Sequence, residues 1–246
     1  MLQQTSVARV MPKYEAFLEA FPTPGALAEA PLGDALRLWS GLGYPRRCRN
    51  LQATAVVLHE QFEDCMPDSI EELLKLPGIG QYTARAVLAF AHRMDVAVVD
   101  VNVSRVLSRL EGIPMKARAL QTFADELVPQ GLGWEWNQVM MDFGARHCTV
   151  RAPKCDTCPA RRECRYKGVG EDPAQLSAGV SKPQARFEGS DRQARGRAMR
   201  AVSSGAMKIN DVVEAMRVDE ERALVLIASL VNEGLLQRTG SMITLP

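Results

Sequence analysis

The sequence lacks any apolar run that approaches the roughly 18–20 residues a transmembrane helix requires. Residues 1–30 also lack the basic, apolar and small-residue segments of a secretory leader in series, so we expect no export. No bias points to a disordered, collagenous or fibrous chain, since 46% of the 246 residues are hydrophobic, 24% are charged, and glycine and proline number 18 and 14. These absences predict a globular cytoplasmic protein of one or two domains, with no membrane partner.

Net charge is also nearly absent, at +1, yet the charges are segregated along the chain. Four arginines and no acid occur in residues 35–58, and seven lysines or arginines accompany two acids in residues 145–167. Six acids and no lysine or arginine occupy residues 59–72. Such a protein can present a basic face to a phosphate backbone. Ordinary surface alternation explains the pattern equally well, so charge alone leaves the partner open.

Cysteine is scarce outside one loop: Cys48 and Cys65 stand alone, and we interpret each as a buried or unused thiol. Disulfides are not expected in a reducing compartment. The remaining cysteines have the spacing C-x6-C-x2-C-x5-C and are Cys148, Cys155, Cys158 and Cys164. This loop is typical of a metal site, for which zinc and an iron–sulfur cluster compete. A single C-x-x-C with one outlying cysteine on each side favours a [4Fe–4S] cluster over zinc.

Strand-like alternation is rare in the first 166 residues, where apolar residues recur at steps of three and four and predict helices. The spacing predicts an amphipathic helix over residues 7–21 that carries Val7, Val10, Met11, Tyr14, Phe17, Leu18 and Phe21. Ser69 and Glu72 form a capping box that predicts a helix from residue 70.

The last 80 residues follow a different pattern. Residues 169–190 lack apolar periodicity and are interpreted as a linker. Predicted helices at 191–202, 209–216 and 219–232 then precede a hairpin that turns at Thr239–Gly240. Three helices and a terminal hairpin predict a winged helix.

Two motifs suggest chemistry, although each has an ordinary structural explanation. The turn Leu76–Gly80 (LPGIG) lies between two predicted helices, where backbone N–H groups at a helix N-terminus can bind phosphate or the turn can simply reverse the chain. Asp100 precedes a predicted helix, where aspartate is a preferred N-cap. A fixed carboxylate can also stabilise an oxocarbenium ion at a sugar C1′.

In combination, these motifs resemble the helix-hairpin-helix DNA glycosylases, and are most similar to the adenine DNA glycosylases of the MutY type. The resemblance covers about residues 1–166, and we expect it not to extend further. The segments that carry it are 1–10 (MLQQTSVARV), 39–50 (WSGLGYPRRCRN), 76–87 (LPGIGQYTARAV), 99–110 (VDVNVSRVLSRL), 137–145 (NQVMMDFGA) and the cysteine loop.

The resemblance implies an all-α glycosylase fold with an iron–sulfur loop, to which the winged-helix-like segment is added. The predicted domains are a helical barrel over 1–136 with its helix-hairpin-helix at about 70–92, a cluster region over 137–168, the linker over 169–190 and a C-terminal domain over 191–246. It also implies a monomer that binds double-stranded DNA containing a mispair and is associated with the nucleoid.

The resemblance assigns catalysis to three residues. Asp100 matches the essential carboxylate, and Asn102 matches the asparagine that helps to position it. Tyr82 stands where bifunctional relatives have a lysine that attacks C1′ and forms a Schiff base. Tyrosine cannot do this, so a monofunctional enzyme that leaves an abasic site is implied.

Further residues match DNA-contacting and metal-binding positions. The residues that wedge into the duplex during base flipping are Gln3, Gln4, Thr5, Leu42 and Tyr44. Arg46, Arg47 and Arg49 suit phosphates, as do Leu76, Gly78 and Gly80 of the hairpin turn. The four cysteines match ligands of a [4Fe–4S] cluster, and Trp39 is expected in the core.

Two departures from the family pattern follow. Family members carry a catalytic glutamate two residues before the methionine that is Met1 here, so we expect this chain to be impaired, through a misassigned start codon or a truncation. Residues 167–246 do not resemble the domain with which many members check for 8-oxoguanine. The expected activity is removal of adenine opposite 8-oxoguanine or guanine. The alternatives are a thymine or uracil mismatch glycosylase and a non-catalytic iron–sulfur DNA-binding protein.

Overall fold

The computed structural model describes residues 1–3, 5–179 and 186–246. The chain folds into two compact units. The first unit contains residues 1–67, 76–78 and the C-terminal residues from 184 on, and the second contains residues 68–75 and 79–183. In the described part of the chain, no helix is both long and apolar enough to cross a membrane.

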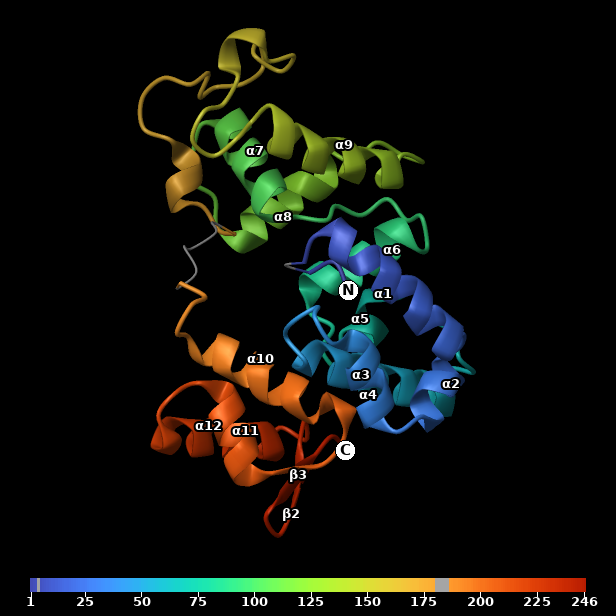
Figure 1. The fold of residues 1–246 in the computed structure, drawn as a ribbon. Helices are drawn as coiled ribbons and strands as arrows, with labels where there is room; N and C mark the ends of the chain where they lie inside the picture. The colour runs from blue at the N-terminus through green and yellow to red at the C-terminus, as the bar shows by residue number, and fades with distance from the viewer. Residues whose placement is uncertain (4, 180–185) are drawn as a thin grey trace. The chain divides into compact units, whose positions relative to one another are not determined.

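The first unit combines helices from the two ends of the sequence (Figure 1). Its elements are α1 (Val7–Ala20), α2 (Pro24–Glu29), α3 (Leu32–Trp39), α4 (Arg46–Gln61), α10 (Asp191–Ala201), the 3-10 helix η3 (Val202–Ser204), β1 (Met207–Lys208), α11 (Ile209–Met216), α12 (Glu220–Asn232), β2 (Gln237–Thr239) and β3 (Met242–Thr244). Phe17 and Trp39 from the N-terminal helices share one hydrophobic core with Ala198 and Leu230 from the C-terminal helices. Trp39 is buried, as predicted.

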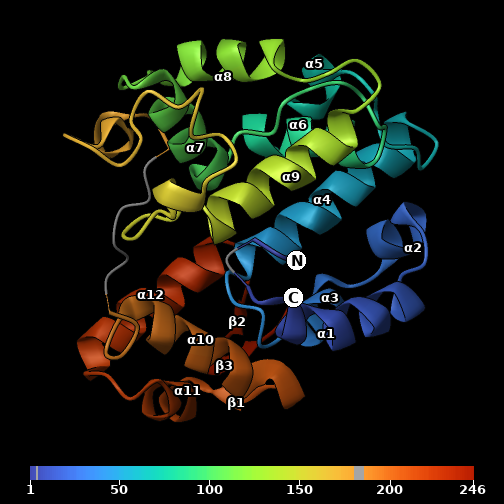
Figure 2. The same cartoon turned by 90° about the horizontal axis from the view of Figure 1, so that it is seen from above.

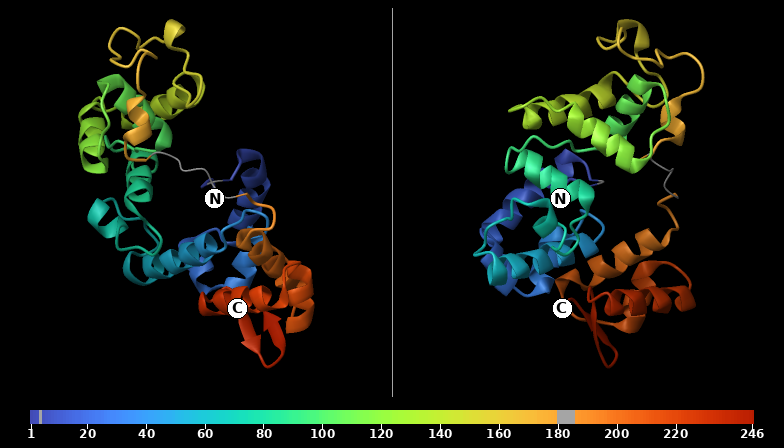
Figure 3. Two further views of the ribbon diagram at one scale, coloured as in Figure 1. Left: turned by 90° about the vertical axis from the view of Figure 1, so that its left-hand side faces the viewer. Right: turned by 180° about the vertical axis from the view of Figure 1, so that it is seen from behind.

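The predicted helices and hairpin of the C-terminal segment are present (Figure 2). β3 pairs antiparallel with both β1 and β2, with Arg238 opposite Ile243, and the two strands of the hairpin are drawn as arrows in Figure 3. Ile243 is buried and lies in the shared core. The small antiparallel sheet and three helices fit the winged-helix-like prediction.

The predicted apolar face of α1 is only partly buried. Val10 and Phe17 lie in the core, whereas four other apolar residues of the predicted face are 45–62% exposed, namely Val7, Met11, Tyr14 and Leu18. The helix forms where it was predicted, but its apolar residues extend round more of its surface than the packed side covers.

The second unit consists of helices and loops. Its elements are α5 (Ile70–Leu73), α6 (Gln81–Phe90), α7 (Val101–Glu111), α8 (Ala117–Glu126), α9 (Gly133–Arg146) and the 3-10 helices η1 (Cys155–Thr157) and η2 (Pro173–Leu176). The Ser69 side chain accepts a hydrogen bond from the Glu72 N–H and so caps α5, as predicted. α7 packs against α9 and α8, and its residues Val103 and Leu107 are fully buried.

Part of the segment interpreted as a linker is packed rather than extended. Asp172 caps η2 by accepting a hydrogen bond from the Ala174 N–H, and η2 contacts α7. Ser104 of α7 donates a hydrogen bond to the Ala178 carbonyl. The absence of apolar periodicity concealed this packing, because polar groups hold the segment in place. The predicted domain boundaries stay predictions.

Candidate functional site

Asp100 caps α7 with both carboxylate oxygens engaged. Its Oδ1 accepts hydrogen bonds of 2.8 Å from the backbone N–H groups of Asn102 and Val103. Its Oδ2 accepts a 2.9 Å bond from Asn102 Nδ2. These bonds hold the carboxylate in a fixed position at the positive end of the helix dipole.

The chain that leads to Asp100 is held by side chains from α8 and α9. Asn137 is fully buried, and it accepts a 2.7 Å hydrogen bond from the Val98 N–H while donating a 2.8 Å bond to the Val96 carbonyl. Asp125 accepts a 3.0 Å bond from the Ala97 N–H. Irregular backbone in a core needs such partners, because an unpaired buried polar group is costly. Asp100 is therefore placed by a loop with little freedom to move.

A hydrogen-bonded chain connects Asp100 to the cysteine loop through Asn102 and Arg105. The Asn102 Oδ1 accepts a 3.0 Å bond from Arg105 Nη2, which also donates to the Gly144 carbonyl at 2.7 Å. Arg105 Nε donates to the Cys148 carbonyl, also at 2.7 Å. Burial lowers the pKa of Arg105, but the guanidinium remains a cation at neutral pH. One buried arginine thus orients the amide that bonds to the carboxylate.

Gly144 permits this arrangement because α9 passes very close to Asn102. A Cβ at position 144 would lie 2.7 Å from the Asn102 Cβ and 3.1 Å from its carbonyl oxygen. Real Cβ atoms essentially never approach another atom so closely. A side chain here would push Asn102 away and disturb its bond to Asp100.

Tyr82 of α6 lies in the same unit as Asp100 and is 43% exposed. Burial raises the pKa of its hydroxyl, and the negative charge of Asp100 raises it further. Tyr82 therefore stays neutral at physiological pH and offers no amine. Gly80 is the N-cap of α6, and a Cβ there would meet no atom within 4 Å, so the protein leaves this helix start open.

The four loop cysteines line a single cavity, whose other walls include Phe143, Tyr166 and Arg109. Burial raises the pKa of the Cys155 thiol, and the charges of the other three cysteines add to this rise, so the four sulfurs influence one another. Nevertheless, among the residues that the structure describes, no three cysteine, histidine or acidic side chains converge closely enough to hold a single ion. Four thiols spread round one largely apolar cavity suit a group larger than an ion.

The two isolated cysteines differ. Cys48 is 1% exposed, and burial raises the pKa of its thiol to about 12, so it is an inert core residue. Cys65 is exposed.

In the first unit, Arg47 connects the N-terminal residues to the loop that precedes α4. Its guanidinium donates to the carbonyls of Gln3 at 2.6 Å and Leu42 at 3.1 Å, and lies over the rings of Trp39 and Tyr44. Thr5 also donates to the Leu42 carbonyl, at 3.1 Å. The structure therefore brings together Gln3, Thr5, Leu42 and Tyr44, whereas Gln4 lies outside the described residues. The Leu42 side chain is buried, while Tyr44 is 36% exposed.

The neighbouring arginines of α4 contact Glu233, which follows α12. Arg46 Nε donates to Glu233 Oε2 at 2.6 Å, Arg195 donates to the same oxygen at 2.6 Å, and Arg49 donates to the Glu233 carbonyl. Burial alone raises the pKa of Glu233, but the hydrogen bonds from Arg46, Arg195 and Ser229 outweigh it and lower this pKa to about 2. The Arg46 side chain remains 62% exposed despite its ion pair.

The turn Leu76–Gly80 of the predicted helix-hairpin-helix includes Leu76, which is buried, and Gly78, which has a positive φ of 76°. A Cβ on Gly78 would lie 2.6 Å from Asn50 Nδ2, so both backbone geometry and space require glycine. Thr54 donates a 2.8 Å hydrogen bond to the Pro77 carbonyl.

Sequence reasoning missed Arg105, Asn137 and Gly144 as site residues. All three lie within segments that carried the resemblance, 99–110 and 137–145, but without assigned roles. Arg105 had one usable signal: it follows Val101 by four residues, so on a helix that starts at Val101 it lies one turn beyond the first helical residue.

Comparisons with known proteins show the family to which the chain belongs. Residues 1–130 match the family model of the HhH-GPD superfamily base excision DNA repair protein. An adenine DNA glycosylase of Mycolicibacterium smegmatis is 38% identical over 98% of this chain and 82% of its own length. The human adenine DNA glycosylase is 38% identical over 73% of this chain and 34% of its own length. The expectation that the likeness stops near residue 166 is wrong, because the mycobacterial alignment includes nearly the whole C-terminal segment.

Two solved structures are also similar. A thermostable thymine-DNA glycosylase has a TM-score of 0.63 and 28% identity, covering 68% of this chain and 80% of that one. A trapped covalent intermediate of endonuclease III with DNA has a TM-score of 0.61 and 26% identity over the same shares of the two chains.

Proposed function

Because the chain belongs to the HhH-GPD superfamily of base excision DNA repair proteins, we propose that it hydrolyses the N-glycosidic bond of adenine mispaired with 8-oxoguanine or guanine. It is a DNA glycosylase, a hydrolase acting on glycosyl bonds, and its partner is DNA. The mispair, the residue roles and action as a monomer are the proposal. The observation that carries it is the Asp100 carboxylate, fixed at the start of α7 by three hydrogen bonds.

In this mechanism Asp100 stabilises the positive charge that develops at C1′ as the base departs. A preorganised carboxylate does this without reorganising, which is the main source of electrostatic catalysis. Asn102 holds Oδ2 of Asp100 in place, and Tyr82 supplies no amine for a Schiff base. Water therefore attacks C1′, and the product is an abasic site with an intact strand.

We assign recognition of the duplex to the loop before α4 and to the turn Leu76–Gly80 between α5 and α6. Tyr44, with its exposed ring, would wedge into the stack, supported by Gln3, Gln4, Thr5 and Leu42. Arg46 would bind phosphate, and Arg47 would hold the loop in shape. The backbone at Leu76, Gly78 and Gly80 would bind a second phosphate.

The four loop cysteines would hold a [4Fe–4S] cluster, for which the shared cavity and the four thiols are suited. When bound, the cluster supplies a rigid anchor for the basic loop that carries Arg151, Lys154 and Arg161. The chain Cys148–Arg105–Asn102 then fixes the position of Asp100 relative to that loop.

Single-turnover base release tests the activity, on duplexes with adenine opposite 8-oxoguanine, adenine opposite guanine and thymine opposite guanine. The chain is compared with a version extended to place a glutamate two residues before Met1. Asp100→Asn is the control, because asparagine also caps helices well. We expect adenine release that falls by at least about 100-fold in Asp100→Asn and rises with the added glutamate, in line with the about 10²- to 10⁴-fold worth of a general acid.

Thymine release is the second candidate, favoured by the likeness to the thymine-DNA glycosylase. Thymine released in place of adenine would establish that alternative. DNA binding with no base release from either version would contradict the enzyme and leave an iron–sulfur DNA-binding protein.

A further inference from the structure

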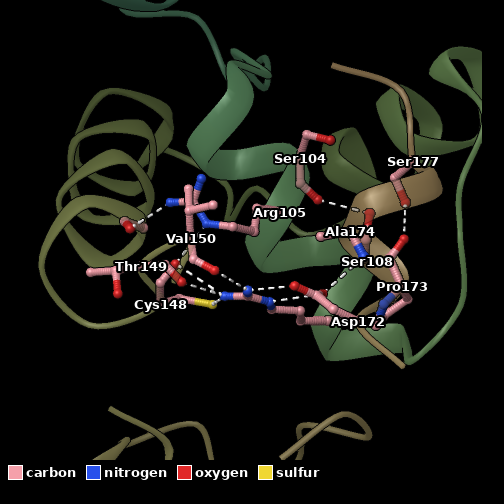
Figure 4. Close-up of polar contacts among 12 residues, drawn as sticks. Ser104, Arg105, Ser108, Cys148, Thr149, Val150, Asp172, Pro173, Ala174 and Ser177 are labelled. Carbon is pink, nitrogen blue, oxygen red and sulfur yellow. Dashed lines mark hydrogen bonds and ion pairs between the residues drawn. The ribbon is translucent and has the colours of Figure 1, made fainter. Parts of the chain in front are cut away.

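A second arginine of α7, Arg109, lies against the cysteine loop and is only 2% exposed. Its Nη1 is 3.4 Å from the Cys148 Sγ and donates to the Thr149 carbonyl at 2.8 Å (Figure 4). Its Nη2 donates to the Val150 carbonyl at 3.1 Å. A buried positive charge is thus within hydrogen-bonding distance of a sulfur that lines the cavity.

Asp172 neutralises this charge from the opposite side. Arg109 Nε is 3.0 Å from Asp172 Oδ1, and Nη2 is 2.6 Å from Oδ2, so the pair is bidentate. Asp172 thus binds Nε and Nη2 of Arg109, whereas the Cys148 Sγ contacts Nη1 of the same guanidinium. The Asp172 side chain is 12% exposed, so water screens its interaction with Arg109 only weakly.

Asp172 is held beside Arg109 because the segment that follows Asp172 is hydrogen-bonded to α7 and to Met115, which lies just after α7 in the sequence. The Ser177 hydroxyl accepts a 3.0 Å bond from the Met115 N–H, and the Ala178 N–H donates to the Met115 carbonyl at 2.8 Å. Ser104 donates to the Ala178 carbonyl. These bonds hold the segment of Asp172 in place, and this segment follows the cysteine loop in the sequence.

We propose that Arg109 and Asp172 are a positioning pair that sets the reduction potential of the iron–sulfur cluster held by the four cysteines. The inference rests on the cluster assigned under the proposed function. An N–H···S bond and a nearby positive charge stabilise the reduced, more negative state of such a group. Arg109 therefore raises the potential of the one-electron couple, and Asp172 offsets part of that rise.

Two variants should shift the potential in opposite directions. Asp172→Asn leaves Arg109 uncompensated and should raise the potential, whereas Arg109→Met removes both the charge and the N–H···S bond and should lower it. The potential is measured by voltammetry of the purified full chain without DNA, with the electrode supplying the electron. Asp156→Asn is the matched control: it removes the same charge beside Cys155, but from a carboxylate that is 97% exposed, and should shift the potential much less.

The iron and acid-labile sulfide contents of the unaltered chain and of each variant are measured first. Their absence from the unaltered chain would overturn the proposed cofactor itself. A cluster present in all variants, with potentials that stay constant or move in the same direction, would overturn only the role of Arg109 and Asp172. If Arg109→Met does not fold, Arg109→Lys keeps the charge and should leave the potential nearer the original than Asp172→Asn does. The reverse order would also refute the pair.

Discussion

Two groups of arginines in this protein use their charge in different ways. Arg105 and Arg109, one helical turn apart on α7 of the second unit, are 8% and 2% exposed and donate to backbone carbonyls of the cysteine loop. Arg46 of α4 in the first unit is 62% exposed and forms an ion pair with the Glu233 carboxylate. Arg105 and Arg109 are buried, so water cannot replace the carbonyls to which they donate, and both arginines therefore hold the structure in place. Under the proposed function, the exposed Arg46 would exchange its carboxylate partner for a DNA phosphate.

This comparison separates positioning of the reaction from binding of the DNA. Carbonyls bonded to Arg105 would lose their donors if it moved, at a cost of about 1–3 kcal/mol each. On the Arg46 side, the Arg46–Glu233 ion pair is largely open to water, which screens it, so losing it should disturb the structure less than losing Arg105. We therefore expect changes at α7 to affect chemistry and stability, and changes at Arg46 to affect affinity.

Replacing Arg105 with methionine should have the largest effect. The Gly144 carbonyl and the Asn102 Oδ1 lose the hydrogen bond from Arg105, and the Cys148 carbonyl keeps only a 3.4 Å bond from Arg109, so the free energy of unfolding should fall by about 2–4 kcal/mol. Base release should fall by about 100-fold, since Asn102, which positions Asp100, loses the donor that orients it. Urea denaturation and single-turnover kinetics measure the two effects. An unaltered rate in a folded variant would show that Asn102 holds Asp100 without help from Arg105.

Gly144→Ala should separate positioning from charge, because it leaves every arginine in place. The new Cβ must displace Asn102, which should cost about 1–3 kcal/mol and reduce base release by about 10-fold or more. Gly196→Ala is the matched control: it also lies within a helix, but its Cβ would meet no atom within 4 Å. That change should stabilise the protein by about 0.5–1 kcal/mol. Equal effects of the two substitutions on base release would contradict the close contact at Asn102.

Glu233→Gln should reduce stability by about 1–3 kcal/mol, because Arg46 and Arg195 lose a charged acceptor. The pKa of Glu233 is lowered from its ordinary 4.5 to about 2, so its contribution is complete above pH 4.5 and disappears as the pH falls through about 2. Unfolding of both proteins is measured across this range, with exposed Glu214→Gln as control. A difference that persists undiminished at pH 2 would refute the assignment.

Arg46→Gln should have the smallest effect on stability and a measurable one on affinity. If Arg46 binds one phosphate, the slope of log K against log salt should decrease by about 0.9. Salt titrations of duplex binding measure it, with exposed Arg217→Gln as a control. An unchanged slope would leave Arg46 as a structural partner of Glu233 alone.

The same contrast explains what could be predicted from the sequence. Asp100, the Ser69 cap and the C-terminal helices were predictable, because capping residues and apolar periods are local signals. Arg105 and Arg109 were not, since their partners are carbonyls some 40 residues away that sequence patterns do not reveal. The packing of Asp172 was missed for the same reason, because its partner is 63 residues distant.

A run of arginines in the sequence was also a poor predictor of which side chains are available to bind phosphate. The run Arg46–Arg47–Arg49 suggested three phosphate contacts, but Arg47 donates to the carbonyls of Gln3 and Leu42, and Arg49 to that of Glu233. Only the fold shows which guanidinium remains largely exposed.

The most direct test of the division between the two arginine groups measures rate and affinity in the same two variants. Arg105→Lys and Arg46→Gln are compared by single-turnover base release at saturating enzyme and by the Kd for an adenine–8-oxoguanine duplex. Arg105→Lys should lower the rate by about 10-fold or more with little change in Kd, and Arg46→Gln should weaken binding with little change in rate. A slower reaction at saturation in Arg46→Gln, or weaker binding with an unchanged rate in Arg105→Lys, would contradict the division.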